Sequence, residues 1–142
     1  MSDPIPPPTA RRPEEVLELV SQALSDGDLE AALAQYEPGA LIRPWAKKAA
    51  TDGETVAGTL RCLMELRLPL SASVRAVLPT RGIALVLGER HIAGLGPDGQ
   101  RVQLRGAGST VVRQQPDGAW RIVADAWCLD GLDGLGAAGL ID

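Results

Sequence analysis

The chain is poor in aromatic residues and in residues that bind metals. It contains three Trp, one Tyr and no Phe, so its core must be built mainly from Leu, Val, Ile and Ala. One His and two Cys, Cys62 and Cys128, lie far apart in the sequence. They cannot supply a metal cluster, a disulfide framework or a nucleophile–histidine–acid triad. We therefore expect no metal ion and no cofactor.

The sequence also lacks a basic surplus and a long apolar run. Its net charge of −4 gives nucleic acid no electrostatic attraction. No stretch of about 18 apolar residues could span a membrane, and the opening "MSDPIPPPTARRP" has no apolar core of a signal peptide. These absences predict a cytoplasmic protein without a nucleic-acid or membrane partner.

Hydrophobic periodicity divides the chain into helices followed by strands. We expect a proline-rich, disordered arm over residues 1–12, one domain over 13–128 and a Gly-rich tail over 129–142. Helices are predicted at 14–24, 29–36 and 55–66, and a short extended segment at 40–45. Strands are predicted at 71–79, 82–94, 100–114 and 119–129, with hairpin turns at "GPDG" 96–99 and "QPDG" 115–118. This order predicts an α+β domain.

Two passages resemble a known family. The early "GDLEAALAQYEPGALIRP" and the late "PDGAWRIVADAW" are similar to SnoaL-like and ketosteroid-isomerase-like proteins of the NTF2-like superfamily. They are closest to the domains of unknown function near the calcium/calmodulin kinase association domain. The resemblance implies a cone: a curved antiparallel sheet wrapped around three N-terminal helices, with a mouth that admits a small, mostly apolar molecule. It also implies a homodimer formed through the outer sheet face.

The catalytic residues of ketosteroid isomerases do not carry over to this chain. The resemblance places Arg43 where the isomerase has its general base, and an arginine cannot accept a proton at neutral pH. Val20 and Thr110 stand where the isomerase has the tyrosine and the acid that bind the oxyanion. Isomerisation of a steroid is therefore not expected.

Limonene-type epoxide hydrolases give a partial match. Arg90 corresponds to their arginine, but Ile92 and Trp127 stand where their two aspartates would be. Asp125 lies two residues before Trp127 on the same, inward face of the strand, and it could reach Arg90 across the pocket.

Strand alternation assigns the two faces of the last strands. In the strand at 119–129 the resemblance places Val123, Asp125, Trp127 and Leu129 inside. The outer face would then hold Trp120, Ile122, Ala124, Ala126 and Cys128, and this apolar set predicts a homodimer. For the strand at 83–94 the resemblance points Ala84, Val86, Gly88, Arg90 and Ile92 inward. The larger apolar side chains belong to the opposite face, which holds Ile83, Leu85 and Leu87 and would bring Glu89 and His91 inside. Both readings stay open.

The candidate site follows from these placements. Asp125, Arg90 and Arg43 are the candidate catalytic residues, and the candidate ligand-binding residues are Trp45, Trp127, Thr110 and His91. Asp125 could also be a purely structural partner of an arginine. We expect Asp125→Asn to lower ligand affinity or activity more than folding, at a cost of about 1–3 kcal/mol in stability.

Two functions remain open. One is an isomerase, cyclase or hydrolase acting on an apolar, polyketide-like molecule, and the other is a non-catalytic ligand-binding or dimerisation module.

Overall fold

A computed structural model describes residues 5–45, 48–50, 53–96 and 98–133. Three helices are present, namely α1 (Glu15–Ser25), α2 (Leu29–Leu33) and α3 (Gly53–Glu65). The strands are β1 (Tyr36–Trp45), β2 (Lys48–Ala50), β3 (Leu70–Thr80), β4 (Ile83–Leu95), β5 (Arg101–Gln114) and β6 (Trp120–Asp133). The predicted α+β class and the order of helices and strands are confirmed.

Local chemistry explains where the helices begin. Asp28 caps the start of α2, because its carboxylate accepts a hydrogen bond of 3.0 Å from the backbone nitrogen of Ala31. The backbone nitrogens of Arg11 and Arg12 both donate to Glu15 at the start of α1. One apolar face of α1 is buried against the sheet and includes Val16, Leu17, Val20, Ala23 and Leu24.

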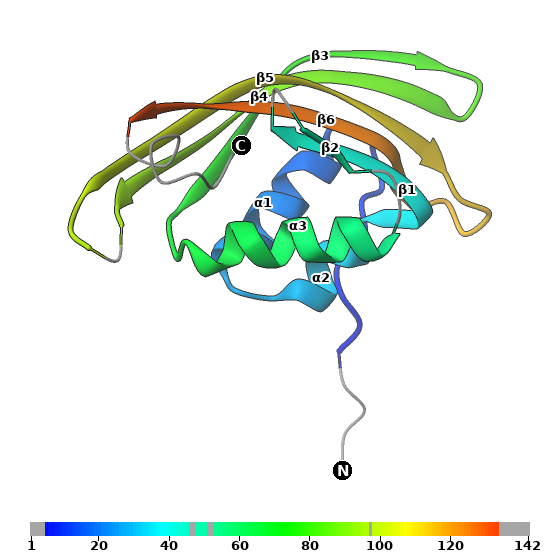
Figure 1. Ribbon diagram of the computed structural model, residues 1–142. Coiled ribbons are helices and arrows are strands. Elements are labelled where there is room, and N and C mark those ends of the chain that lie inside the picture. Colours follow the sequence, from blue (N-terminus) through cyan, green and yellow to red (C-terminus); the bar gives the residue numbers. More distant parts are fainter. Residues whose placement is uncertain (1–4, 46–47, 51–52, 97, 134–142) are drawn as a thin grey trace.

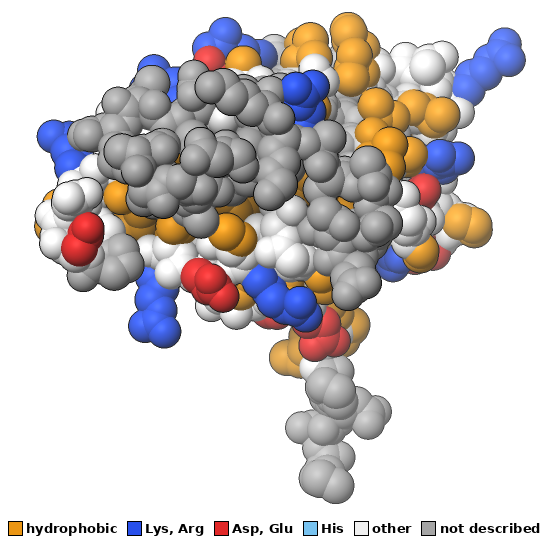
Figure 2. Space-filling model, in the orientation of Figure 1, with side chains coloured by type: hydrophobic (Ala, Val, Ile, Leu, Met, Phe, Trp, Pro, Cys, Tyr) orange, Lys and Arg blue, Asp and Glu red, His pale blue; other side chains and the backbone are white. Residues whose placement is uncertain are grey.

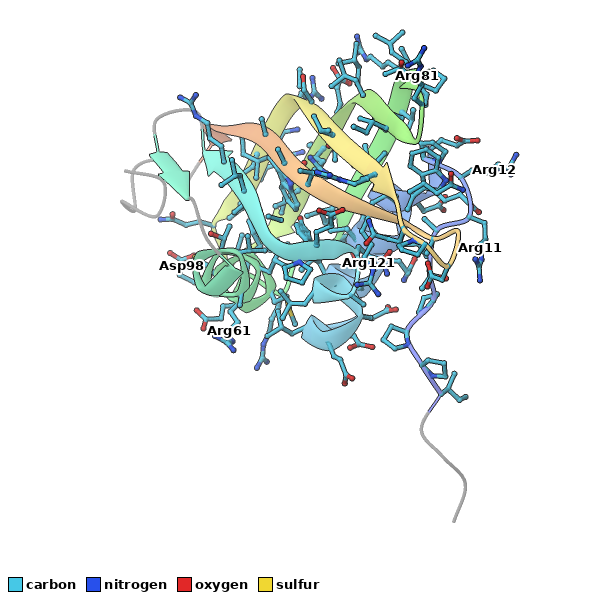
Figure 3. The ribbon with its side chains drawn as sticks, turned by 90° about the vertical axis from the view of Figure 1, so that its right-hand side faces the viewer. Arg11, Arg12, Arg61, Arg81, Asp98 and Arg121 are labelled. Carbon is cyan, nitrogen blue, oxygen red and sulfur yellow. The ribbon has the colours of Figure 1, made fainter. Side chains whose placement is uncertain are left out.

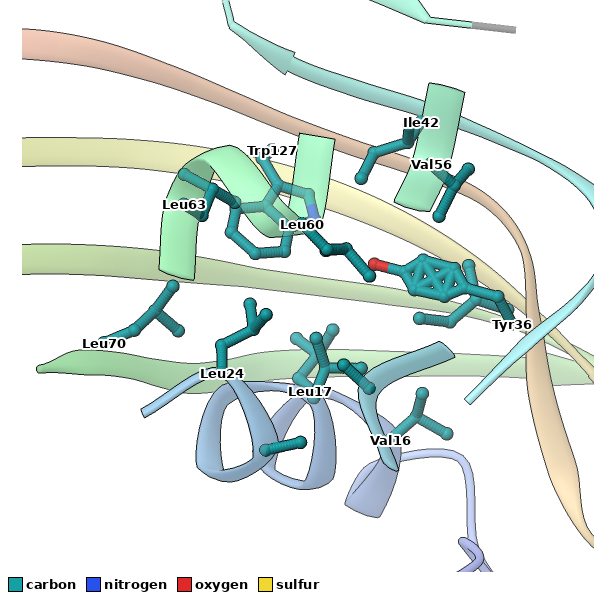
Figure 4. Packing of buried hydrophobic residues seen from close by; sticks show 14 of the residues in the cluster. Val16, Leu17, Leu24, Tyr36, Ile42, Val56, Leu60, Leu63, Leu70 and Trp127 are labelled. Atoms are coloured by element: carbon teal, nitrogen blue, oxygen red, sulfur yellow. The ribbon is translucent and has the colours of Figure 1, made fainter. Parts of the chain in front are cut away.

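The strands form one strongly curved sheet in the order β2-β1-β6-β5-β4-β3, and the helices fill its concave side (Figure 1). The predicted cone is therefore present. One detail differs: β1 runs parallel to β6, so the sheet is mixed and not purely antiparallel. The core lies between the sheet and the helices, where Leu17, Leu60 and Trp127 are packed (Figure 4).

Gly108 permits a close approach between two strands. A Cβ atom at Gly108 would lie 2.3 Å from the carbonyl oxygen of Ala126 and 3.3 Å from the Cα of Trp127. Only glycine leaves room for this contact, which lies where β5 bends over β6. Glycine at 108 is therefore needed for the close packing of β5 on β6.

A bulge in β6 changes which residues face the core. Val111 pairs with Ala124, but the next residue, Val112, pairs with Ile122, so Val123 is an extra residue. The alternation is reset there, and Trp120 and Ile122 are buried in the same core as Asp125. The prediction that Trp120 and Ile122 lie on the outer face was wrong because a regular alternation cannot anticipate a bulge. The side chain of Cys128 lies outside the described part.

Both ends of the predicted domain extend further than expected. Ala10 is fully buried and pairs with Trp120, although residues 1–12 were expected to be disordered. The carbonyl oxygen of Pro8 accepts a hydrogen bond from Gln35, and Arg11 donates to the carbonyl oxygen of Asp117 in the β5–β6 turn (Figure 3). At the other end, β6 continues through residues 129–133, where a tail was expected. Backbone pairing holds both segments in place. Amino-acid composition does not reveal such pairing.

Candidate functional site: a buried carboxylate with five donor contacts

The centre of the candidate site is the carboxylate of Asp125, which accepts hydrogen bonds from side chains of β1, β4, β5 and β6. Its Oδ1 accepts from Thr110 Oγ1 at 2.8 Å and lies 3.2 Å from Arg90 Nη1. Its Oδ2 accepts from Tyr36 Oη at 2.9 Å, from Arg90 Nη2 at 3.2 Å and from Trp127 Nε1. The sequence predicted that Asp125 could reach Arg90, and this contact is present.

Arg90 and Asp125 form an ion pair that water does not reach. Their side chains are 2% and 0% exposed. The Arg90 guanidinium also lies over the indole of Trp127, with 4.1 Å between its carbon and the ring centroid. Its Nε is buried, and within the described residues it has no hydrogen-bond partner. Arg90 Nε is thus the donor of the cluster that could bond to an added acceptor.

Tyr36 is protonated at neutral pH and donates its hydroxyl hydrogen to Asp125 in this cluster. Burial raises the pKa of Tyr36 well above its ordinary value, and the neighbouring Asp125 carboxylate raises it further. The hydroxyl points into the core towards Leu60 and Trp127 (Figure 4). Tyr36 therefore stays protonated and helps to hold Asp125.

Arg90, Thr110, Asp125 and Trp127 are brought together, whereas Arg43 and His91 are not part of this cluster. Arg43 is exposed on β1. Trp45 ends β1, and its side chain lies outside the described part. His91 is half-buried and has its Nε2 at 3.3 Å from Gln103 Nε2.

The question of which face of β4 is inside is now settled. Burial alternates along the strand, and Ala84, Val86, Gly88, Arg90 and Ile92 are the buried set. His91 therefore faces the opposite side of the sheet from Asp125. It lines a hollow of about 410 Å³ there, together with Ser71, Ala72, Ser73, Glu89, Arg90 and Arg105.

Sequence reasoning missed Tyr36 and Ser21. Tyr36 was assigned to the end of a helix, but it begins β1 and points at Asp125. Its being the only tyrosine in the chain was the one available signal. The prediction of a helix at 14–24 did not single out Ser21, whose hydroxyl is buried without a hydrogen-bond partner among the described residues.

Comparison with known proteins identifies the fold. No family model matches the chain, and no curated protein sequence matches it. A ketosteroid isomerase-like protein from Erwinia carotovora atroseptica superposes with a TM-score of 0.71 at 14% identity, over 85% of this chain and 94% of that one. An NTF2-like protein of unknown function from Pseudomonas putida gives a TM-score of 0.59 at 17% identity, over 80% of each chain. This chain has the NTF2-like fold.

The NTF2-like fold was expected from the resemblance and is confirmed. A protein from Thiobacillus denitrificans, named for the association domain of calcium/calmodulin-dependent protein kinase II, also shares it. The TM-score is 0.69 at 15% identity, over 88% of this chain and 98% of that one. No described helix has both the length and the apolarity to cross a membrane. Across the described residues, no three His, Cys, Asp or Glu side chains are grouped so that they could hold a metal ion.

Proposed function

We propose that this NTF2-like protein binds a small, mainly apolar molecule inside its cone, and that the molecule presents a neutral carbonyl oxygen to Arg90 and Ser21. The observation that carries the proposal is a pair of buried polar atoms, Arg90 Nε and Ser21 Oγ. Neither has a hydrogen-bond partner in the described part of the chain. The two residues are 2% and 5% exposed. An unpaired buried donor costs about 1–3 kcal/mol, so an acceptor that reached both atoms would be stabilising.

The register of α1 on the sheet places Ser21 at the level of Arg90. Leu17 lies against Gly88, because its Cδ1 is 3.2 Å from the position of a Cβ there. Two turns later, Ser25 bonds to the backbone of Leu70.

Leu70 pairs with Ile92, and the intervening pair on the two strands is Ala72 with Arg90. Eight helical residues rise about 12 Å and four strand residues about 13 Å, so α1, which packs mainly on β3, keeps step with the β3–β4 pair. Ser21 is midway between Leu17 and Ser25 on one stripe of the helix. Along the helix axis it therefore lies at the same height as the Ala72–Arg90 pair.

The charges select the chemistry of the ligand. Arg90 and Asp125 together are neutral, so an anionic group would add an uncompensated charge to a buried site. A carbonyl oxygen is neutral and has two lone pairs, one for Arg90 Nε and one for the Ser21 hydroxyl. The surrounding walls are apolar and include Leu17 and Trp127.

The geometry favours binding over acid–base catalysis. Both oxygens of Asp125 already accept hydrogen bonds, and protonation of either would displace a donor. Asp125 is therefore assigned the role of positioning Arg90, with Thr110 and Tyr36 holding the carboxylate. Trp127 supplies apolar wall and stacks on Arg90. Arg43, Trp45 and His91 have no part in this proposal.

The test uses two probes of the same shape. Acetophenone carries the carbonyl, and α-methylstyrene replaces its oxygen with a CH₂ group. We expect the protein to bind both, measured by ligand-observed NMR titration, with acetophenone about tenfold tighter through its hydrogen bonds. Ser21→Ala should reduce the affinity for acetophenone about fivefold and leave that for α-methylstyrene unchanged.

Ser25→Ala is the matched control. It removes a hydroxyl from the same helix, but one already bonded to Leu70, so it should lower stability and leave the preference for acetophenone intact. Equal affinity for the two probes, or no binding of either, would overturn the proposal.

We also propose a homodimer through the outer sheet face. The predicted residues Trp120 and Ile122 are in the core, but other apolar side chains lie on that face. Leu78 and Ile83 are 54% and 39% exposed, and Leu85, Leu87 and Val111 are half-buried beside them. Figure 2 shows apolar side chains gathered over the upper right of the molecule. A second copy of the chain would cover this face.

Sedimentation tests the dimer. We expect the wild type to sediment as a dimer and Leu87→Lys to sediment as a monomer with an unchanged circular dichroism spectrum. A monomeric wild type at micromolar concentration, or a Leu87→Lys variant that stays dimeric, would overturn this interface.

A further inference from the structure

We propose a second binding site, separate from the Arg90 cluster, in which Arg121 holds the carboxylate of a small aromatic acid. The site is a hollow of about 230 Å³ where α2, α3, β1 and β6 meet. It is lined by Leu33, Tyr36, Glu37, Pro38, Gly39, Val56 and Arg121. A cavity of about 150 Å³ is enough to bind benzene, so this hollow has room for one substituted ring.

Most of the wall is apolar and suits the ring. Leu33, Pro38 and Val56 contribute aliphatic surface, and Tyr36 contributes its own ring. Tyr36 also separates this hollow from the Arg90 cluster, because its ring lines the hollow while its hydroxyl bonds to Asp125 in the core. A molecule in the hollow would therefore not reach Arg90.

The charges around Arg121 favour an anion. Arg121 pairs in register with Arg113 on the neighbouring strand, and like charges directly opposite repel each other. Glu37 is the carboxylate in the wall, and it is engaged by Arg113 at 3.2 Å and by Gln115 at 2.7 Å, both through its Oε2. Because Arg113, which is not a lining residue, pairs with Glu37, the charge of Arg121 has no free carboxylate to balance it among the lining residues.

Arg121 is also the group with hydrogen-bonding capacity to spare. Its Nε is sealed from solvent and has no hydrogen-bond partner in the described ranges. Arg121 extends beside the start of β1 (Figure 3). A carboxylate would pair with Arg121 through charge-assisted hydrogen bonds while its ring occupied the apolar part of the hollow.

The experiment compares benzoate with its neutral isostere benzamide. We expect saturable binding of benzoate, about tenfold or more tighter than benzamide because the bonds to arginine are charge-assisted. Arg121→Gln should abolish this preference. Arg81→Gln, a change of equal charge in the β3–β4 turn, should leave it intact and so controls for net charge.

Two further measurements separate this site from the Arg90 cluster. Ser21→Ala should not alter benzoate binding, and benzoate should not displace acetophenone. The inference is overturned if benzoate shows no saturable binding, if benzamide binds equally well, or if Arg121→Gln retains the preference. It is also overturned if benzoate competes with acetophenone. Apart from the competition measurement, these results do not depend on acetophenone binding, so the two proposals fail independently.

Discussion

Replacing Asp125 by Asn keeps the shape of the side chain and removes its charge. The amide can place its nitrogen at either oxygen position, and both positions face donors. At the Oδ1 position the nitrogen meets Arg90 Nη1, and at the Oδ2 position it meets Arg90 Nη2 and Trp127 Nε1. Thr110 and Tyr36 can reverse their hydroxyl groups to accept a hydrogen bond, but Arg90 and Trp127 can only donate. At least one donor of Arg90 therefore loses its partner.

The magnitude follows from burial. Breaking a buried ion pair by removing one partner costs about 3–5 kcal/mol, because the remaining charge stays buried. The Arg90 side chain is 2% exposed, so no solvent compensates its charge. This raises the cost above the 1–3 kcal/mol expected from sequence for a hydrogen-bond penalty alone. For 142 residues, the unfolding entropy is about 0.3 kcal/mol per kelvin, so the melting temperature should fall by about 10–17 °C.

Chemical denaturation and thermal melts on the same variants measure this cost. Glu37→Gln is the matched control, because its pair with Arg113 is half exposed and should be worth less than about 1 kcal/mol. The double variant Arg90→Met, Asp125→Asn should recover much of the loss, since it removes both charges while the amide still bonds to Tyr36, Thr110 and Trp127. If Asp125→Asn lowered the free energy of unfolding no more than Glu37→Gln does, the isolation of the Arg90–Asp125 pair from water would be refuted.

Three further predictions concern single residues. The pKa of Tyr36 is raised in the folded state, so protonated Tyr36 stabilises the folded protein. This stabilisation is complete below about pH 10 and is lost as the pH rises through the folded-state pKa. Tyr36→Phe should remove this alkaline loss, and tyrosinate absorbance reports the titration directly because Tyr36 is the only tyrosine. Gly108→Ala should destabilise the protein by several kcal/mol, because its Cβ would clash with the carbonyl oxygen of Ala126. Gly58→Ala should instead stabilise the protein by about 0.5–1 kcal/mol in denaturant melts, because Gly58 is an exposed helical residue with open space around it. Ser21→Ala should raise stability by about 1–2 kcal/mol, since it removes an unpaired buried hydroxyl and improves helix propensity, and a loss of stability would mean that the hydroxyl has a partner.

The sequence predicted the elements well because their signals are local. The apolar stripe of α1, the cap at Asp28 and the turn at 115–118 each depend on residues within one or two turns of chain. In the turn at 115–118, Gly118 N donates to Gln115 O as expected. The parallel pairing of β1 with β6 could not be predicted in this way, because it joins segments about 80 residues apart and no local pattern records it.

The site was predicted in part for the same reason. Arg90, Thr110, Asp125 and Trp127 were found because the family resemblance, combined with strand alternation, puts them on the inner face, and they do meet. Tyr36 was missed because α2 ends at Leu33 and the chain then turns into β1, where the sequence still reads as helix. The faces of Trp120 and Ile122 were wrong because one extra residue in β6 reverses the alternation.

The central position of β6 has a consequence for how the chain can fold during synthesis. β6 is the last of the strands to be made, yet it pairs with β1 on one side and β5 on the other. Until residues 120–133 have left the ribosome, β1 has no inner neighbour, and Arg90 lacks the carboxylate that neutralises it. The earlier strands β3, β4 and β5 can form their hairpins, but the concave core cannot close. Folding of the complete domain is therefore expected to begin only after residues 120–133 have been made, and its rate should be set by the long-range joining of β6 to β1.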